Sequence, residues 1–220
     1  MELYHVMNRG VDKRNIVMDD RDRKRFVRDL YEMNNIEPVT NLWYTASNPF
    51  NDIGRHYDGR KKLVDIHAWC LMGNHYHLLL SERIEGGMSV FLKKLNMGYA
   101  KYFNARHARS GALFQGKTKR VLIKRDAHFL YILLYIHCNP LDFMKGGNTW
   151  KSQSLARPGA ALTWLGQYRW SSYHDYLDNG EFTAIVDGSD LYAHRKDHAR
   201  EIRHYLTSAH DFSQDDTNLE

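Results

Sequence analysis

Residues 69 to 81 read Trp-Cys-Leu-Met-Gly-Asn-His-Tyr-His-Leu-Leu-Leu-Ser, and this stretch decides the fold. Successive side chains of a β-strand point to opposite faces, so His75 and His77 share one face while Tyr76 and Leu78 occupy the other. The apolar face is expected to be buried. The opposite face carries two imidazoles about 7 Å apart along the strand, close enough to bind one divalent ion. The alternative is a pair of half-exposed histidines on a solvated strand.

The composition indicates a soluble globular protein. The chain has 220 residues, of which 43% are hydrophobic and 26% charged, enough for one domain with a sizeable core. Its 31 Lys and Arg against 26 Asp and Glu give a net charge of +5, which is compatible with a polyanionic partner. Cys70 and Cys138 lie in apolar runs and are expected to be reduced. We find no membrane-spanning stretch or signal-peptide pattern and expect a cytoplasmic protein without a membrane partner.

Around the histidine strand, the pattern predicts strands at residues 2–8, near 66–70 and at 119–124. Gly73-Asn74 predicts a tight turn that joins the second strand to the histidine strand in a hairpin. Asp19 or Asp20 is expected to cap a first helix, and Ser89 a second helix that ends near residue 105. Residues 35–61 are expected to be a long loop, and 105–116 a basic one.

The element order is therefore strand, helix, strand, strand, helix, strand. This order predicts an α+β fold of the ferredoxin-like (RRM-type) class, an antiparallel sheet backed by two helices.

A third helix is predicted from Asp126 to the stop at Pro140. It has a broad apolar arc, and opposite that arc Tyr131, Tyr135 and Asn139 recur every four residues, which makes them neighbours on one face. The alternative is that the tyrosines only border the core, with their hydroxyl groups in water.

Beyond Pro140 the pattern weakens. Residues 144–160 are expected to be a polar linker, and the aromatic-rich segment 164–177 to pack on the domain. A charged helix is predicted over 190–206, with Leu191, Ile202 and Leu206 as its contacts. The last ten residues are expected to be disordered. We therefore divide the chain into a domain at 1–143 and an extension at 144–220.

The two informative stretches suggest one chemistry. Two imidazoles and one amide form an incomplete metal shell, which leaves positions for a phosphate oxygen and water. A tyrosine hydroxyl beside such a shell could attack the phosphorus and form a covalent intermediate. A free tyrosine has a pKa near 10, so forming its phenolate at pH 7 costs about 4 kcal/mol without help. Whether a metal-bound water, His5 or another group acts as the base is left open.

These residues resemble a known family. Asn74-His75-Tyr76-His77 is similar to the HUH motif of single-tyrosine nucleases, and 111–115 and 135–140 are similar to signatures of their insertion-sequence transposases. The opening 4–10 and the later 170–173 resemble the REP-associated tyrosine transposases in particular. The segments 35–61 and 142–167 are longer than the family pattern, which leaves the role of both open.

The resemblance implies a metal-dependent single-stranded DNA endonuclease and strand transferase, a transposase that acts on single-stranded or hairpin (REP-like) DNA. It implies a 5′-phosphotyrosine intermediate and a free 3′-hydroxyl. By position, Tyr135 is the nucleophile, and His75, His77 and Asn139 hold Mg²⁺ or Mn²⁺. Hard ions suit an open phosphate site, although the histidines would also accept zinc or copper.

Two further expectations concern the partners of the chain. The DNA contacts are expected at Arg9, Lys117, Lys119 and Arg120, which follow or flank strands near the proposed site. The sequence does not decide between a monomer and a homodimer.

Two other functions fit parts of the pattern. A non-catalytic RRM-like binder of single-stranded nucleic acid would explain the fold and the charge, but it leaves the histidine pair and the tyrosine stripe without a role. A replication initiator or relaxase of the same chemistry would differ by needing origin-like DNA.

Overall fold

One antiparallel sheet forms the centre of the molecule. The computed structural model describes residues 2–38, 60–124, 126–147, 149–152, 154–177, 180–187 and 197–208, with the side chains of 126–128 left aside. The strands lie in the order β2-β3-β1-β4. Their bounds are β1 Leu3–Arg9, β2 Val64–Leu71, β3 His75–Glu82 and β4 Lys119–Ile123.

The helices α1 (Asp20–Glu32) and α2 (Gly87–Arg106) connect these strands in the order expected for a ferredoxin-like domain. The short 3-10 helix η1 (Val11–Lys13) lies between β1 and α1. Both the α+β class and the antiparallel ferredoxin-like topology predicted from the sequence are therefore confirmed.

The register of β1 on β3 defines the two faces of the sheet. Met7 lies opposite His77, and Arg9 lies opposite His75. Residues directly opposite in an antiparallel pair share a face, so alternation also puts His5 on the face of the two histidines. On the other face the Tyr76 ring packs 5.1 Å from that of Phe26 in α1.

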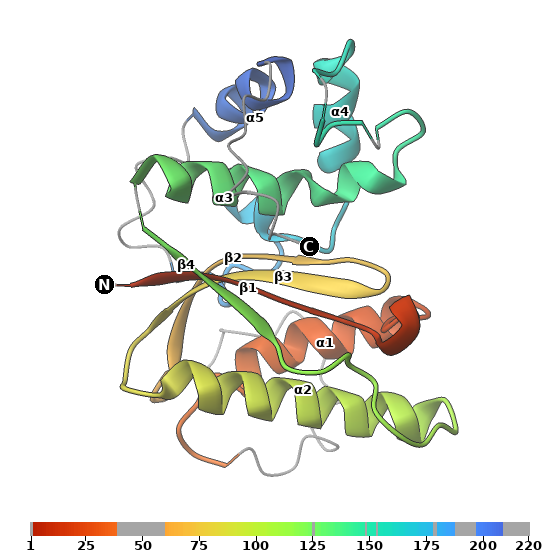
Figure 1. Cartoon of the computed structure of the whole chain (residues 1–220), viewed down its shortest axis with the longest axis vertical. Coiled ribbons are helices and arrows are strands. Elements are labelled where there is room, and N and C mark those ends of the chain that lie inside the picture. The colour runs from red at the N-terminus through yellow and green to blue at the C-terminus, as the bar shows by residue number, and fades with distance from the viewer. Residues whose placement is uncertain are drawn as a thin grey trace.

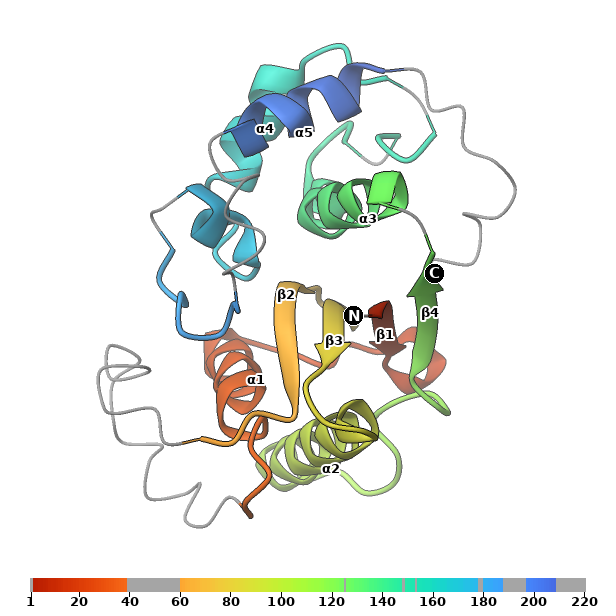
Figure 2. The same ribbon diagram turned by 90° about the vertical axis from the view of Figure 1, so that its left-hand side faces the viewer.

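The sheet is the middle of three layers (Figures 1 and 2). On one side lie α1 and α2, and on the other side lies α3 (Asp126–Cys138), which contacts β2, β3 and β4. β3 is therefore buried from His75 to Ser81, on both of its faces. The alternative of half-exposed histidines on a solvated strand is wrong, because α3 covers this face.

The first two helices begin differently from each other. The Asp19 carboxylate accepts hydrogen bonds from the backbone N–H groups of Arg21 and Asp22, so Asp19 is the N-cap of α1. The cap predicted at Ser89 for α2 is wrong. Gly86 precedes that helix in a left-handed conformation (φ 70°), which glycine adopts without steric strain, and Ser89 lies inside the first turn.

Short helices follow α3. The first is η4 (Asn139–Phe143), and the C-terminal extension adds α4 (Pro158–Leu165), η5 (Ser172–Leu177) and α5 (His198–Thr207), of which α5 contacts α3. The expected linker at 144–160 is partly wrong, since Trp150 is buried in the core and α4 begins at Pro158. Ile202 and Leu206 of α5 are buried as predicted.

Several expectations fall outside the described residues: the loop from 39 to 59, Leu191 and the last ten residues. Cys70 and Cys138 are buried free thiols, as expected. Among the described helices, none has the length and apolar character that crossing a membrane requires.

Candidate active site

His77 lies at the centre of the buried face and contacts a second histidine. Its Nδ1 is 3.0 Å from Nε2 of His5, and the two rings stack with centroids 5.2 Å apart. His77 is 0% exposed, and its Nε2 has no hydrogen-bond partner among the described residues. A buried nitrogen without a partner is costly to maintain, so this atom requires a ligand or a functional reason.

His75 is oriented by the residue before it. Its Nδ1 lies 2.6 Å from Oδ1 of Asn74, while Nδ2 of Asn74 donates to the carbonyl of Lys13 at 3.1 Å. A carbonyl oxygen only accepts, so the amide group of Asn74 faces Lys13 and its oxygen faces His75. The His75 Nδ1 must then carry the proton, and neutral His75 keeps its lone pair on Nε2.

Tyr135 reaches the histidines from α3. Its ring centroid is 5.7 Å from that of His77 and 6.0 Å from that of His5, both in edge-on contact. The His75 and His77 rings are 4.9 Å apart, so the structure gathers both histidines and this tyrosine between β3 and α3. Tyr135 is only 4% exposed.

Asn139 lies directly after the last residue of α3, where Pro140 prevents the helix from continuing. Its Nδ2 donates to the Tyr135 carbonyl at 2.8 Å, which satisfies one of the terminal carbonyls of the helix. Its Oδ1 is buried and has no hydrogen-bond partner in the described chain. A second buried polar atom without a partner therefore lies at the end of α3, one turn after Tyr135.

The electrostatics favour a neutral His77 imidazole. Burial, followed by the neighbouring His75 and His5, holds the pKa of His77 well below its usual value of 6.5. His77 is therefore neutral at pH 7, which is the form that binds a metal ion.

A metal ion fits this donor set only if the amide takes part. The described residues contain no group of three His, Cys, Asp or Glu side chains able to hold a metal. His5 is no third ligand through Nε2, because that atom faces His77. Two imidazole nitrogens and the Asn139 oxygen leave coordination positions for substrate and water, and the unpartnered His77 Nε2 and Asn139 Oδ1 fit such an ion.

Sequence reasoning missed two residues that contact the Tyr135 ring, Trp150 and Lys151, and a third, Asp142, that holds them. Trp150 packs 5.4 Å from this ring, and Nζ of Lys151 lies 5.8 Å from its centroid. Asp142 links the two, since one of its oxygens accepts from the Trp150 indole at 2.7 Å and the other pairs with Lys151 at 3.0 Å. The tryptophan within an otherwise polar segment was the available signal.

Tyr131 has different neighbours. Its ring is 6.3 Å from Tyr135 and 5.7 Å from Tyr205 of α5. Burial, and after it the charge and hydrogen bond of Tyr131, raises the pKa of Tyr205. Tyr131 therefore borders the extension, one turn further from the end of α3 than Tyr135.

The predicted DNA contacts do not all lie together. Arg9 and Lys119 share the sheet face of His77, since Met7 pairs with both His77 and Lys119. Arg120 lies on the opposite face and donates to Ser89 Oγ at 3.0 Å. Lys117 is exposed just before β4. No contact with DNA is tested by this arrangement, and all four stay predictions.

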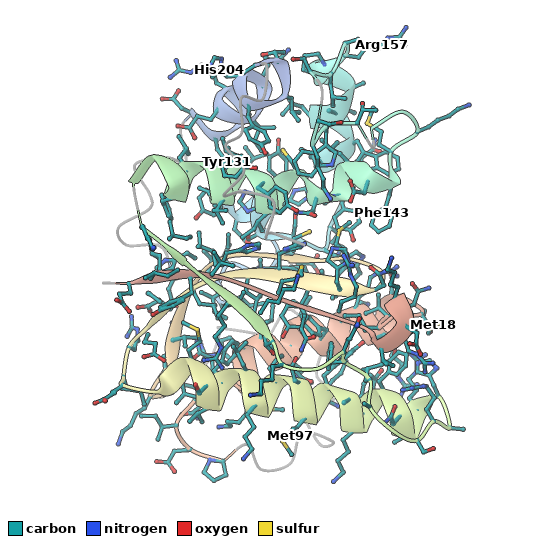
Figure 3. The ribbon with its side chains drawn as sticks, viewed as in Figure 1. Met18, Met97, Tyr131, Phe143, Arg157 and His204 are labelled. Carbon is teal, nitrogen blue, oxygen red and sulfur yellow. The ribbon has the colours of Figure 1, made fainter. Side chains whose placement is uncertain are left out.

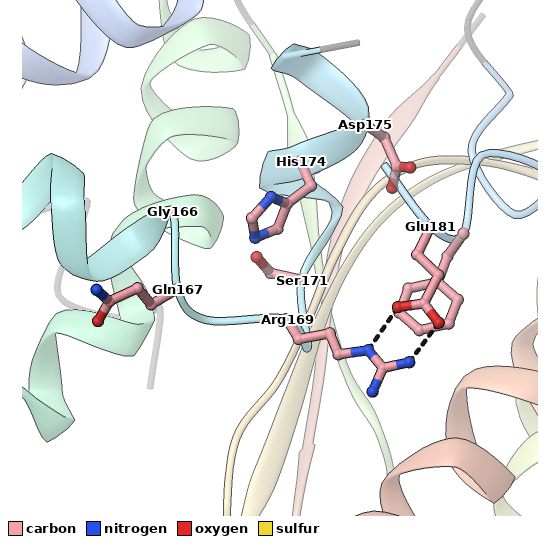
Figure 4. A pocket seen from close by; sticks show the side chains of 8 residues that line it. Gly166, Gln167, Arg169, Ser171, His174, Asp175 and Glu181 are labelled. Atoms are coloured by element: carbon pink, nitrogen blue, oxygen red, sulfur yellow. Dashed lines mark hydrogen bonds and ion pairs between the residues drawn. The ribbon is translucent and has the colours of Figure 1, made fainter. Parts of the chain in front are cut away.

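A hollow of about 230 Å³ lies apart from these residues, in the segment 166–182 (Figure 4). Its arginine, Arg169, makes a bidentate ion pair with Glu181. The positive charge there is already neutralised, so this hollow is poorly suited to a phosphate.

Comparison with known proteins gives a limited result. No protein-family model matches the chain, and no curated protein matches it. A solved structure described as "Structure of the REP associates tyrosine transposase bound to a REP hairpin" is similar, with 11% sequence identity and a TM-score of 0.44. The match covers 86% of this chain and 86% of the other. Similarity at this level does not assign a function.

Proposed function

We propose that this chain is a metal-dependent single-stranded DNA endonuclease and strand transferase, with Tyr135 as the nucleophile. One observation carries the proposal: the Tyr135 ring contacts His77, whose buried Nε2 has no partner among the described residues, and Asn139, bonded to the Tyr135 carbonyl, has a second such atom in its Oδ1. The resemblance of 74–77 and 135–140 to the motifs of single-tyrosine HUH transposases agrees with this assignment.

In this mechanism the Tyr135 hydroxyl oxygen attacks a backbone phosphorus of DNA. The new bond joins phosphorus to the tyrosine, the bond from phosphorus to the 3′ oxygen breaks, and that oxygen leaves as a 3′-hydroxyl after receiving a proton. The 5′ end remains attached to Tyr135. A 3′-hydroxyl of another strand then attacks the same phosphorus and releases the tyrosine, which completes strand transfer.

His75, His77 and Asn139 would hold Mg²⁺ or Mn²⁺, through Nε2 of each histidine and Oδ1 of the amide. When bound, such an ion polarises a phosphate oxygen as a Lewis acid. With Nε2 of His77 as a ligand, its Nδ1 carries the proton and donates to His5. His5 then orients His77 and accepts through Nε2, which argues against His5 as the base through that nitrogen.

Lys151 lies beside the nucleophile, with its ammonium group 5.8 Å from the ring centroid. Because Asp142 pairs with this ammonium group, Lys151 would position the Tyr135 ring and is not a free positive charge. Asp142 fixes this ammonium group and the Trp150 indole together, so the segment after α3 becomes part of the site.

The covered sheet argues against an RRM-like binding protein. Such domains stack bases on an open sheet face, and here both faces lie beneath helices. A binding module would also hold DNA equally well in EDTA and never cut it.

The decisive experiment looks for a covalent protein–DNA band. The protein is incubated with a labelled DNA hairpin that carries single-stranded flanks, with Mn²⁺ or with EDTA, and is then denatured. Wild type should give the band only with Mn²⁺, and both Tyr135→Phe and the double variant His75→Ala with His77→Ala should lose it. Circular dichroism checks that each variant is folded. A band that persists in the double variant or in EDTA would contradict the metal site.

A further inference from the structure

A second hollow, of about 470 Å³, lies between the loop after β1 and the loop after α2. Arg14 and Arg109 give it positive charge, and none of the described residues that line it is acidic. Its apolar part includes Met18, which is 60% exposed, and the ring of Phe103. This combination suits an anionic ligand with a flat apolar part, as a nucleotide has.

The loop after β1 is built to present Arg14. Asp12 and Lys13 have left-handed backbones, with φ of 55° and 58°, which non-glycine residues seldom adopt. The Arg14 side chain donates through Nε to the Val11 carbonyl at 3.3 Å, which directs its guanidinium group. Strained turns of this kind persist where function requires the geometry.

The second loop is fastened to the first. The Val11 N–H donates to the Leu113 carbonyl at 2.9 Å, and the Gln115 N–H donates to the Arg9 carbonyl at 2.8 Å. Arg109 donates to the Asn104 side chain at 2.5 Å and lies 6.0 Å from the Phe103 ring centroid. Arg14 and Arg109 therefore lie on two loops that are hydrogen-bonded to each other.

The β2–β3 turn lies next to both the hollow and Phe143. The Ile16 N–H donates to the Gly73 carbonyl at 2.9 Å. A Cβ built on Gly73 would lie 3.5 Å from Oδ1 of Asn15, which lines the hollow, and 3.9 Å from Cζ of Phe143. Gly73 is therefore a neighbour of both Asn15 and Phe143.

Phe143 ends η4, the 3-10 helix that begins at Asn139. Its ring is 49% exposed and stacks on Tyr168, with centroids 6.0 Å apart. Figure 3 shows Phe143 and Met18 on the same side of the molecule, above and below the level of the β2–β3 turn. An exposed aromatic ring held by a second ring is a suitable platform for a DNA base.

We propose that Phe143, Gly73 and the Arg14 hollow form a binding path for the single-stranded DNA that flanks the cleaved phosphate. One base stacks on Phe143, a neighbouring nucleotide enters the hollow against Met18, and Arg14 and Arg109 contact phosphates. The proposal rests on the proposed function for the identity of the ligand, and it adds where the flanking strand runs.

Charge favours DNA over a protein partner. The cations of this hollow face it without a lining carboxylate, whereas Arg169 of the smaller hollow is paired with Glu181. Asp19, the residue after Met18, is ion-paired with Arg106, and so is the buried Asp22, whose other oxygen lies 2.9 Å from Nε2 of the lining His107. A phosphate would therefore meet net positive charge.

The first test is photo-crosslinking from two exposed methionines. Met18 and, as the matched control, Met97 on the outer side of α2 (63% exposed) are each replaced by p-benzoylphenylalanine in the full chain. The probe is a DNA hairpin with a single-stranded oligothymidine flank, in EDTA so that no cleavage is needed. Position 18 should crosslink to one or two adjacent nucleotides, and position 97 should give no defined crosslink.

The second test measures binding of the same probe. Phe143→Ala should weaken binding about tenfold, and Phe143→Trp should restore it, because stacking needs only a ring. Arg14→Gln should lower the slope of log affinity against log salt by about 0.7, as expected for one lost phosphate contact on a single strand. Arg157→Gln, an exposed arginine at the start of α4, should leave both quantities unchanged.

The outcomes separate this proposal from the proposed function. A Tyr135 adduct of normal yield, without a crosslink from position 18 and without an effect of Phe143→Ala, overturns the path and leaves the nuclease standing. Crosslinks and altered salt slopes without any adduct support the path and refute the nuclease. A protein–protein crosslink from position 18 in place of a DNA crosslink would make the hollow a docking site for a second copy and overturn the proposal.

Discussion

Replacing Asn74 by alanine removes the acceptor that fixes the His75 ring. In the structure, the 2.6 Å bond from His75 Nδ1 to Asn74 Oδ1 requires the proton on Nδ1, and it leaves Nε2 for a metal ion. Without Asn74 the two neutral tautomers compete, and one of them carries a proton on the ligating nitrogen. Losing one hydrogen bond of this kind changes the balance by about 1.4 kcal/mol, so Mn²⁺ affinity should fall about tenfold.

Asn74→Asp is the matched control. Its carboxylate still accepts from His75 Nδ1 but no longer donates to the Lys13 carbonyl, which lies 3.1 Å from the wild-type amide nitrogen. If the tautomer matters, the aspartate variant keeps or raises Mn²⁺ affinity, while the alanine variant loses it. If the bond to Lys13 matters more, both variants lose affinity equally.

Two measurements at pH 8 decide this question. Titration calorimetry gives the Mn²⁺ affinity, and long-range proton–nitrogen NMR of ¹⁵N-histidine protein gives the tautomer of His75. Wild type and Asn74→Asp should both show His75 protonated on Nδ1. The reasoning is refuted if Asn74→Ala keeps that tautomer and binds Mn²⁺ as tightly as wild type.

Three other predictions follow from the described contacts. Tyr135→Phe should keep Mn²⁺ and DNA binding but lose the covalent adduct. Tyr131→Phe should retain the adduct, because the Tyr131 ring packs on Tyr205. The reverse pattern on a denaturing gel would make Tyr131 the nucleophile. Gly10→Ala should lower the free energy of unfolding by more than about 2 kcal/mol, because its Cβ would lie 2.2 Å from the Arg14 carbonyl oxygen. The control Gly159→Ala, which has open space around it, should change the denaturant midpoint little. Burial and then His198 hold the pKa of His137 well below 6.5, so the unfolded chain binds more protons below that pH and stability falls as pH falls. Between pH 7.5 and 5.5 wild type should lose about 1.4 kcal/mol more than His137→Gln, and equal losses in urea melts would contradict this. Taking the difference cancels the opposite contribution of Asp29, whose pKa burial raises to about 7.

The local parts of this architecture could be predicted from the sequence. A period of two puts His75 and His77 on one face, and Pro140 ends the helix beside Asn139, because both effects act over a few residues. The βαββαβ order then fixes the antiparallel sheet. That His75, His77 and Asn139 bind a metal ion stays a prediction.

The long-range parts could not be predicted in this way. The proposed chemistry placed the helix 126–138 beside the histidines, but no periodicity in these residues indicates how completely it buries that sheet face. Trp150 and Lys151 contact Tyr135 because the chain turns back after α3. The composition of this polar segment does not indicate where such turns lie. The prediction of Ser89 as the N-cap of α2 was wrong because Gly86, in a left-handed conformation, precedes the first residue of that helix.

The burial of Tyr135 has a consequence for timing. Tyr135 is 4% exposed and its ring packs against Trp150, so we expect the side chains around it to move before a phosphate reaches it. Chance encounters with DNA elsewhere on the surface would then leave the DNA uncut. Selectivity would arise in this movement, and the waiting time before the first cut would report how often it occurs.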